Sequence, residues 1–304
     1  MSLLVVGSIA LDTVKTPFGE GREVLGGSAT YFSVAASYFA DRVCLVGVVG
    51  GDFPPKHIQL FLQHNIDIEG LHKEDEGLTF RWKGEYNYDL NEAVTLGTHL
   101  NVFSSFNPSL PEAYRECQYV FLANIDPELQ HQVLDQVKQP RLTACDTMNY
   151  WIQGKPQALK KTLERVDILI INDGETRQLA EEANIVRAAK KILSWGPRIL
   201  IVKRGEYGAL MFSANNIFSA PGFPLEYIFD PTGAGDSFAG GFMGYLANVD
   251  TIDETNIRRA IIFGSTMASF CVEDFSLNRL SNLTYPEIEK RYKAFKALTH
   301  FEDI

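Results

Sequence analysis

The sequence predicts an α/β protein in which a mostly parallel sheet lies in a three-layer α/β/α arrangement and carries a small β-sheet lid. Short apolar runs bounded by Gly, Asp or Asn recur along the chain, and amphipathic stretches separate them. Continuous apolar runs are typical of parallel strands that are buried on both faces. Two segments, residues 11–25 and 78–103, break this alternation and predict the lid.

The apolar runs and the amphipathic stretches alternate from the first residues onward. Buried strands are expected at residues 3–6, 43–49, 119–122, 142–145, 168–171 and 199–202. Crossover helices are expected at residues 30–39, 57–64, 127–137, 156–165, 175–183 and 185–195. Right-handed crossovers bring the carboxyl ends of such strands to one edge of the sheet, and we expect the ligand site there.

Polar and apolar residues alternate in the second irregular segment, in the stretches TFRWK (79–83) and YNY (86–88). This pattern predicts strands with one exposed face. Long excursions from a compact sheet are commonly lids over a site, although a surface hairpin without function fits the same pattern. No repeat or linker interrupts the chain, so residues 1–304 are expected to form a single domain.

Composition excludes several classes of protein. Lys and Arg total 28 against 38 Asp and Glu, a formal net charge of -10, and basic residues form no cluster, so binding to nucleic acid is not expected. No apolar run approaches the roughly 20 residues that cross a bilayer. The four cysteines lie far apart in apolar contexts and are expected to be reduced core residues. A strand-like start without a basic and apolar leader favours a cytoplasmic location.

The segment DPTGAGDSFAGGF, residues 230–242, is the most informative about chemistry. Small side chains at Gly233, Ala234 and Gly235 let successive backbone N–H groups converge on an anion, and a helix expected at residues 238–246 points its positive end at the same place. The Asp236 carboxylate would repel a phosphate, but it suits a base that takes a proton from an attacking hydroxyl. The alternative is a turn in which Asp236 caps the helix.

The whole run from Asp230 to Gly241 resembles the second signature of the ribokinase-like carbohydrate and nucleoside kinases, also called the phosphofructokinase-B family. The resemblance extends over nearly the entire chain in the right order. It implies that the ATP γ-phosphate is transferred to a hydroxyl of a sugar or nucleoside, with Asp236 as general base, residues 233–235 around the transferred group, and Thr232 beside ATP.

The resemblance also implies an acceptor site near the N-terminus. Residues 7–12 look like the family's first strand and the Asp that binds substrate hydroxyls, here Asp12, and the pair Gly26 and Gly27 looks like the start of a helix close to the substrate. Tyr31 departs from the pattern, because many relatives have Asn there, and this puts the hydroxyl contacts in question.

The lid offers further candidate contacts with the acceptor. Arg81 is expected to hold a phosphate already present on a sugar, whereas Trp82, Tyr86 and Tyr88 suit stacking on a ring. The same side chains could equally pack the lid or a partner. A sugar, a sugar phosphate and a nucleoside therefore stay open as acceptors. The exposed lid sheet could also pair with a second subunit and form a homodimer.

On the nucleotide side, residues 172–175 resemble the family's Asn-x-x-Glu motif near magnesium and phosphates. The match implies that Asn172 and Glu175 border ATP and that Glu175 orients water on Mg²⁺, while a simple helix cap is the alternative. Residues 203–208 resemble the segment that borders the nucleotide, which implies contacts from Lys203, Gly205 and Gly208. Many relatives carry Thr where Lys203 stands, and a solvated surface lysine is an equal alternative.

Two acids complete the set of candidates. Asp230 matches a position that in many relatives helps to hold a monovalent cation such as K⁺ under the loop of residues 233–235, the anion loop. Asp52, which follows the strand expected at residues 43–49, is either structural or close to the substrate.

Other functions are compatible with the same fold. A non-catalytic nucleotide or sugar sensor cannot be separated from a kinase by fold. A dinucleotide-dependent oxidoreductase requires Gly-x-Gly-x-x-Gly after the first strand, and the stretch GSIALD at residues 7–12 does not supply it. A plain interaction module leaves the ordered motifs unexplained.

Overall fold

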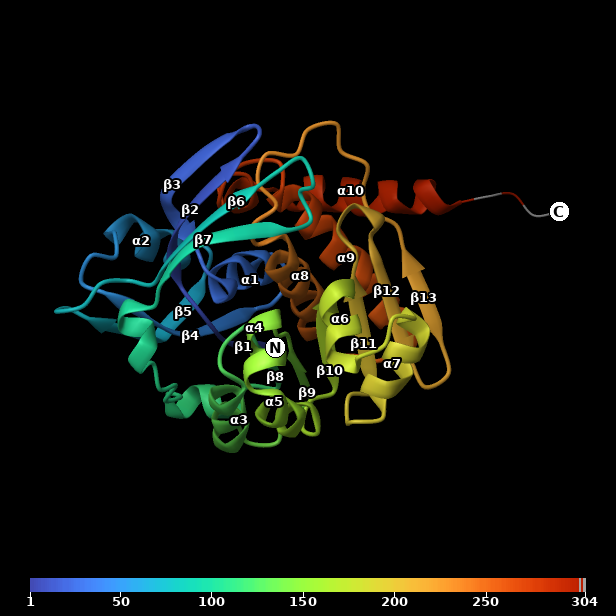
Figure 1. Cartoon of the computed structure of the whole chain (residues 1–304), viewed down its shortest axis with the longest axis horizontal. Helices are drawn as coiled ribbons and strands as arrows, with labels where there is room; N and C mark the ends of the chain where they lie inside the picture. The colour runs from blue at the N-terminus through green and yellow to red at the C-terminus, as the bar shows by residue number, and fades with distance from the viewer. Residues whose placement is uncertain (301, 303–304) are drawn as a thin grey trace.

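The computed structural model describes residues 1–300 and 302 of the chain, which form one sheet of nine strands and a second, separate sheet of four. In the large sheet the strand order is β13-β12-β11-β10-β9-β8-β1-β4-β5, and only β12 and β13 are antiparallel to their neighbours. The small sheet has the order β3-β2-β6-β7 (Figure 1). Both the mostly parallel sheet and the smaller sheet are as predicted.

The strands of the large sheet are β1 (Ser2–Val6), β4 (Arg42–Gly50), β5 (Ile66–Glu74), β8 (Tyr119–Leu122), β9 (Leu142–Cys145), β10 (Ile168–Asn172), β11 (Ile199–Lys203), β12 (Ala209–Ser213) and β13 (Ile217–Ala220). Those of the small sheet are β2 (Ala10–Thr16), β3 (Gly19–Gly26), β6 (Arg81–Tyr86) and β7 (Ala93–His99).

The α-helices are α1 (Ser28–Ser37), α2 (Pro55–Gln63), α3 (Pro127–Gln136), α4 (Asn149–Gly154), α5 (Pro156–Leu163), α6 (Asp173–Ala180), α7 (Ile185–Leu193), α8 (Ala234–Val249), α9 (Glu254–Cys271) and α10 (Tyr285–Thr299). Short 3-10 helices are η1 (Asn101–Ser105), η2 (Glu112–Glu116), η3 (Gly205–Tyr207) and η4 (Leu280–Asn282).

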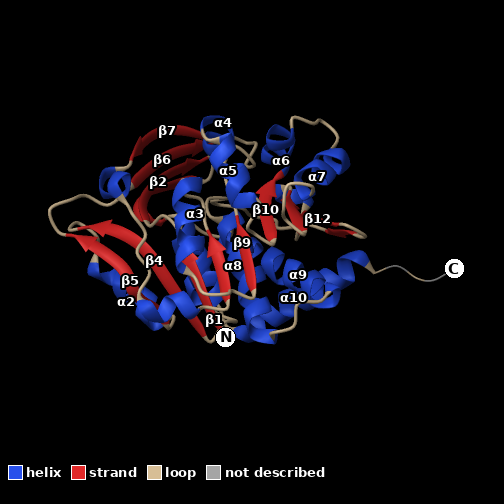
Figure 2. Ribbon diagram, turned by 90° about the horizontal axis from the view of Figure 1, so that it is seen from below, coloured by secondary structure: helices blue, strands red, loops and turns tan. Residues whose placement is uncertain are grey.

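The large sheet is buried on both faces, as the apolar runs predict. In β1, Leu3 and Val5 face the cluster formed by α1, α8 and α9, while Leu4 and Val6 face the cluster formed by α3, α5 and α7. All four side chains are fully buried, because a strand sends alternate residues to opposite faces and helices cover both. The result is the expected three-layer arrangement (Figure 2).

The small sheet lies beyond the carboxyl ends of the central parallel strands, toward which the strand arrows point (Figure 2). Its strands come from the two irregular segments that predicted a lid. Parallel pairing between β2 and β6 joins these two segments, and antiparallel β3 and β7 flank them. The lid therefore stands over the edge of the large sheet where the ligand site is expected.

The predicted elements differ from the structure mainly at their ends and at the margins of the sheet. Helix α8 begins at Ala234 rather than near residue 238, so Gly235 and Asp236 lie in its first turn. β5, β12, β13, α4, α9 and α10 were not predicted. β5 alternates weakly and is half-exposed at the sheet edge, which removes the apolar run that marks a buried strand.

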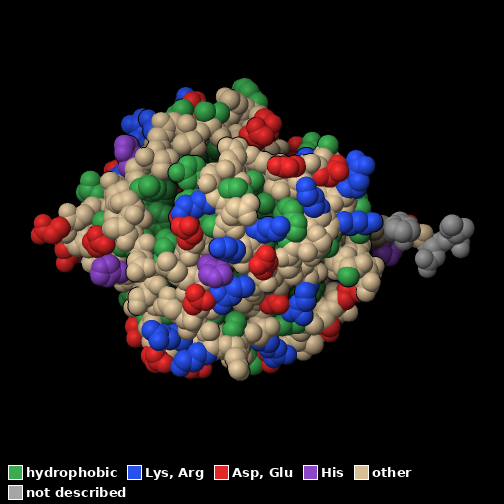
Figure 3. Space-filling view, turned by 60° about the horizontal axis from the view of Figure 1, so that its bottom comes forward, with side chains coloured by type: hydrophobic (Ala, Val, Ile, Leu, Met, Phe, Trp, Pro, Cys, Tyr) green, Lys and Arg blue, Asp and Glu red, His purple; other side chains and the backbone are tan. Residues whose placement is uncertain are grey.

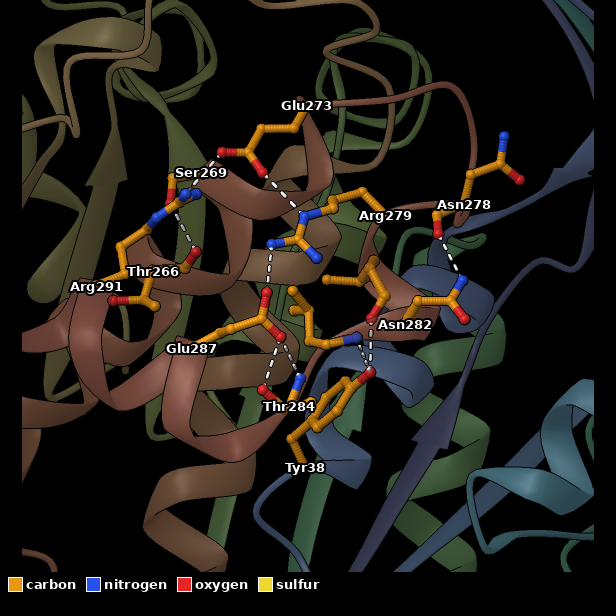
Figure 4. Close-up of polar contacts among 12 residues, drawn as sticks. Tyr38, Thr266, Ser269, Glu273, Asn278, Arg279, Asn282, Thr284, Glu287 and Arg291 are labelled. Carbon is orange, nitrogen blue, oxygen red and sulfur yellow. Dashed lines mark hydrogen bonds and ion pairs between the residues drawn. The ribbon is translucent and has the colours of Figure 1, made fainter.

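Helix α10 is held against the end of α9 by a network of ion pairs (Figure 4). Glu273 pairs with Arg279 at 3.1 Å and with Arg291 at 2.7 Å, and Arg279 also pairs with Glu287 at 2.9 Å. The Arg291 guanidinium lies 3.6 Å from the centre of the Phe270 ring. This network fixes the connection between α9 and η4, which carries a contact to the site.

Two surface features complete the description. On the face shown in Figure 3, acidic and basic side chains are interspersed rather than gathered by sign. Among the described residues, none of the helices combines the length and the apolar character that crossing a membrane requires. All four cysteines are buried and unpaired, in agreement with the expectation of core thiols.

Candidate active site

Gly233 forms the turn that begins the anion loop. Its φ of 77° lies in the left-handed region, where glycine avoids the strain that a side chain would add. A Cβ at this position would also lie 2.4 Å from three atoms of the Tyr31 ring. Tyr31 therefore packs against this turn, and Ala234 N, at the start of α8, donates a hydrogen bond to the Pro231 carbonyl oxygen at 3.2 Å.

Asp236 lies half-buried in the first turn of α8. Burial raises the pKa of its carboxyl group to about 6, and the Lys203 ammonium opposes this rise. Lys203, the last residue of β11, reaches the loop directly, because a Cβ on Gly235 would lie 2.6 Å from its Nζ. The structure thus brings together an acid, a cation and the small residues of the loop.

Asp146 is a site residue that the sequence analysis missed. It follows β9 directly and is 4% exposed, and its Oδ1 has no hydrogen-bond partner among the described residues. Burial and the nearby Asp236 carboxylate raise its pKa well above the ordinary value, while Lys203 opposes the rise. An acid that immediately follows a buried parallel strand was the available signal.

Asn172 and Glu175 form a capping box at the start of α6. Asn172 Oδ1 accepts a hydrogen bond from Glu175 N at 2.7 Å, and Glu175 Oε2 accepts one from Asn172 N at 2.8 Å. The motif therefore does cap a helix. Burial and the Asp236 charge raise the pKa of Glu175, and the Lys203 ammonium opposes this rise. Glu175 therefore belongs, with Asp146, Lys203 and Asp236, to one group of interacting charges, the charged cluster.

Asp12 and the glycine pair meet under the lid. Asp12 is 4% exposed, and its Oδ1 has no partner among the described residues. A Cβ on Gly26 would lie 1.9 Å from Asp12 Oδ2, and one on Gly27, whose φ is 96°, would lie 2.5 Å from the Ser8 carbonyl oxygen. Burial, followed by the Asp230 charge, raises the pKa of Asp12 to about 7. The glycines thus leave space for a carboxylate with unused acceptor capacity.

Asp230 lies beneath the anion loop and is fully buried. Its Oδ1 accepts a hydrogen bond from Thr232 N at 2.9 Å, and its Oδ2 accepts one from Ser276 N at 3.2 Å. Asp230 therefore joins the loop to the connection between α9 and η4. Thr232 in turn donates from its hydroxyl to the Tyr86 hydroxyl of the lid at 3.4 Å.

The glycines at residues 205 and 208 shape the segment after β11. Both have positive φ, 53° at Gly205 and 86° at Gly208. A Cβ on Gly208 would lie 2.1 Å from the Ala220 carbonyl oxygen, and one on Gly205 would lie 1.7 Å from Asn91 Oδ1. Asn91 belongs to the turn between β6 and β7, so the lid reaches this segment as well as the anion loop.

The Arg81 guanidinium makes its contacts within the protein, at the base of the lid. It donates to Asp52 Oδ2 at 2.7 Å, to Glu23 Oε1 at 3.0 Å and to the Thr79 carbonyl oxygen at 3.1 Å. Asp52 also accepts from Thr79 N and Oγ1, each at 2.7 Å. The structure therefore gives both Arg81 and Asp52 a structural position at the base of the lid.

Comparison with known proteins bears directly on this arrangement. The model of the pfkB family carbohydrate kinases matches residues 3–282, which include both glycine-containing signatures and the charged cluster. The chain belongs to the pfkB family. This confirms the predicted family, and with it a kinase of the ribokinase fold.

Curated pfkB relatives cover most of the chain. A cytidine kinase from Thermococcus kodakarensis is 29% identical over 81% of this chain and 88% of its own length. A ribokinase from Lactococcus lactis is 26% identical over 85% of this chain and 87% of its own. A nucleoside kinase from Methanothermobacter thermautotrophicus is 24% identical over 99% and 97%, respectively.

Solved structures of pfkB-type kinases share the fold. The nucleoside kinase of Methanocaldococcus jannaschii superposes with a TM-score of 0.77 at 23% identity, covering 96% of this chain and 98% of that one. A protein from E. coli, provisionally called ribokinase II and solved with ATP and Mg²⁺, gives 0.79 at 20% identity over 96% and 99%.

Proposed function

We propose that this protein transfers the γ-phosphate of ATP to a hydroxyl of a sugar or nucleoside, with Asp236 as the general base. The observation that carries the proposal is the position of Asp236 in the first turn of α8, next to the anion loop and the Lys203 ammonium. ATP would lie along residues 203–208 and Thr232, near Asn172 and Glu175. Its γ-phosphate would face the N–H groups at residues 233–235.

In the proposed reaction, the Asp236 carboxylate takes the proton of the acceptor hydroxyl. The acceptor oxygen forms a bond to the γ-phosphorus as the bond from that phosphorus to the bridging oxygen breaks, and ADP leaves. The N–H groups of the loop stabilise the charge on the transferring group. A pKa of about 6 suits this role, because the base is then mostly ionised at neutral pH and still accepts a proton readily.

The acceptor would bind between Asp12, the glycine pair and the lid. The unpaired Asp12 Oδ1 is a buried acceptor for substrate hydroxyl groups. The buried Tyr31 and the partly buried Tyr86 both lie close enough to Asp12 for its charge to raise the pKa of their hydroxyl groups. Relatives named cytidine kinase, nucleoside kinase and ribokinase support an acceptor with a sugar ring, either free or carrying a base.

The charged cluster fits Mg²⁺ bound with ATP. Asp146 has an unpaired, buried carboxylate oxygen, and Glu175 uses only one oxygen in its cap, so both would hold the ion through its water shell. Bound Mg²⁺ would neutralise charge on the ATP phosphates. Asp230 retains lone pairs beyond its two hydrogen bonds and would accept a monovalent cation such as K⁺.

A homodimer through the lid is a further part of the proposal. β3 and β7 are the edge strands of the small sheet, and β7 carries the apolar side chains Val94 and Leu96, each 51% exposed. Exposed edge strands with apolar side chains favour pairing with another chain. The pairing would bury this face of the lid.

The proposed function is tested by ADP production from MgATP across sugars, sugar phosphates and nucleosides, with K⁺ varied. Turnover that depends on one acceptor and is lost in Asp236→Asn would support it. An enzyme that binds MgATP and turns over none of these acceptors would count against it, as would an Asp236→Asn variant of full activity.

A further inference from the structure

Lys203 occupies the place that a side chain on Gly235 would take. It is the last residue of β11, and a Cβ on Gly235 would lie 2.6 Å from its Nζ. Its ammonium has no ion-pair partner within 4.0 Å in residues 1–300 and 302. The chain therefore holds an uncommitted cation against the anion loop, half-buried at the carboxyl edge of the sheet.

The surroundings of Lys203 are strongly acidic. Asp236 from α8, Asp146 after β9 and Glu175 from α6 all lie within its electrostatic influence, and Lys203 opposes the raised pKa of each. Three carboxylates and one ammonium leave an excess of negative charge. A polyphosphate approaching this edge would be repelled unless cations meet it, and Lys203 is the cation that the chain itself supplies at the loop.

We propose that Lys203 is a catalytic residue that binds the transferring phosphoryl group, approaching it across Gly235. The inference rests on the proposed kinase function and assigns Lys203 to the terminal phosphate, not to the nucleotide in general. Its ammonium would meet the equatorial oxygens of the γ-phosphate, over which charge is spread in the transition state. On this account residue 235 is glycine because any side chain there would occupy the position of the Lys203 ammonium.

The assignment predicts a graded effect on nucleotide binding. Removing the charge in Lys203→Met should weaken MgATP binding at least about tenfold, the loss expected for one charge-assisted contact. AMP carries no group near the loop, so its affinity should change by less than about twofold. Lys203→Arg keeps the charge and should recover part of the MgATP affinity.

Gly235→Ala provides an independent probe of the same contact. The added methyl would displace only the flexible end of Lys203, so the fold should persist. This variant should lose MgATP affinity without losing AMP affinity, as Lys203→Met does. Lys190→Met, an exposed lysine on α7, is the matched control and should bind like the wild type.

The experiment is calorimetric titration of MgATP, MgADP and AMP into the wild type and these variants, with circular dichroism to check folding. A loss confined to MgATP in both Lys203→Met and Gly235→Ala supports the assignment. Equal losses for ATP and AMP, or no loss, overturn it even where the kinase is fully active. If the wild type binds MgATP but phosphorylates no acceptor, only the proposed kinase function is rejected. The MgATP and AMP affinities of the variants would still decide whether Lys203 binds the terminal phosphate.

Discussion

Burial raises the pKa of Asp236 to about 6 and that of Asp12 to about 7, and the Asp236 charge adds to the rise at Asp12. For Asp236 the proposal requires the ionised form. The rate should therefore hold above about pH 7 and fall as the pH drops through about 6, because the base becomes protonated. Asp236→Asn should lower kcat by about 10²–10⁴-fold with little change in MgATP affinity. Steady-state kinetics and calorimetry would check this, with the exposed Asp75→Asn as control.

The fold should be most stable when the Asp12 carboxyl group is protonated. Its folded pKa of about 7 lies above the ordinary 3.8, so the folded state holds the proton more tightly than the unfolded chain does. Stability should thus fall as pH rises from about 4 to about 7, by no more than about 4 kcal/mol. Asp12→Asn removes this penalty and should raise Tm at about pH 8 but not at about pH 4, while acceptor binding is lost. A variant that is less stable at both pH values would refute this account.

Gly233 and Gly235 are close in sequence and differ in what surrounds them. Gly233→Ala places a methyl group in the left-handed region against the Tyr31 ring and should destabilise the fold by about 2–4 kcal/mol. Gly235→Ala meets only the mobile end of Lys203 and should cost far less stability. Denaturant unfolding of the two variants compares them directly, and equal losses would contradict the assigned environments.

At the scale of elements, the lid is held at both ends. Arg81 and Asp52 join its base to the end of β4, and Tyr86 and Asn91 reach Thr232 and Gly205 at its tip. The lid therefore touches both the anion loop and the segment after β11.

Arg81→Met should loosen the base of the lid. Loss of the ion pair with Asp52 should speed amide hydrogen exchange in β6 and β7 and raise KM for the acceptor by less than roughly tenfold, whichever acceptor is used. Hydrogen-exchange mass spectrometry and kinetics would measure both. A loss of affinity confined to phosphorylated sugars would instead indicate that Arg81 contacts the phosphate of the acceptor. Lys83→Met, an exposed lysine of the same strand, is the control.

At the scale of the whole molecule, the exposed face of β7 predicts self-association. Leu96→Asp should place a charge on the proposed interface and convert a dimer to a monomer, because a buried, unpaired carboxylate is unfavourable. Sedimentation velocity would measure the change. Leu62 on α2 is a comparably exposed leucine outside the lid, so Leu62→Asp should leave the oligomeric state unchanged. A wild-type monomer at high concentration would reject the interface.

Local patterns in the sequence predict some strands and helices of the fold and not others. The strands from β1 to β11 that are buried on both faces were predicted, because their apolar runs are continuous, and both lid segments broke the alternation visibly. The half-exposed β5 and the largely exposed β13 carry no such run, whereas β12 does carry one, ALMF at residues 209–212, and was nevertheless not predicted. The start of helix α8 was predicted near residue 238 because the glycines at 233 and 235 favour a turn, whereas the structure begins the helix at Ala234, directly after the contact between Gly233 and the Tyr31 ring.

By itself the sequence determined the family, the layered fold and the loop with Asp236, since these depend on residue types at fixed spacing along the chain. Only the tertiary structure decided which side chains meet. It brought Asp146 into the cluster with Lys203, drew Arg81 into the base of the lid and set Tyr31 beneath the loop. The physical reason is that electrostatics and packing act through space, between residues that lie far apart in the chain.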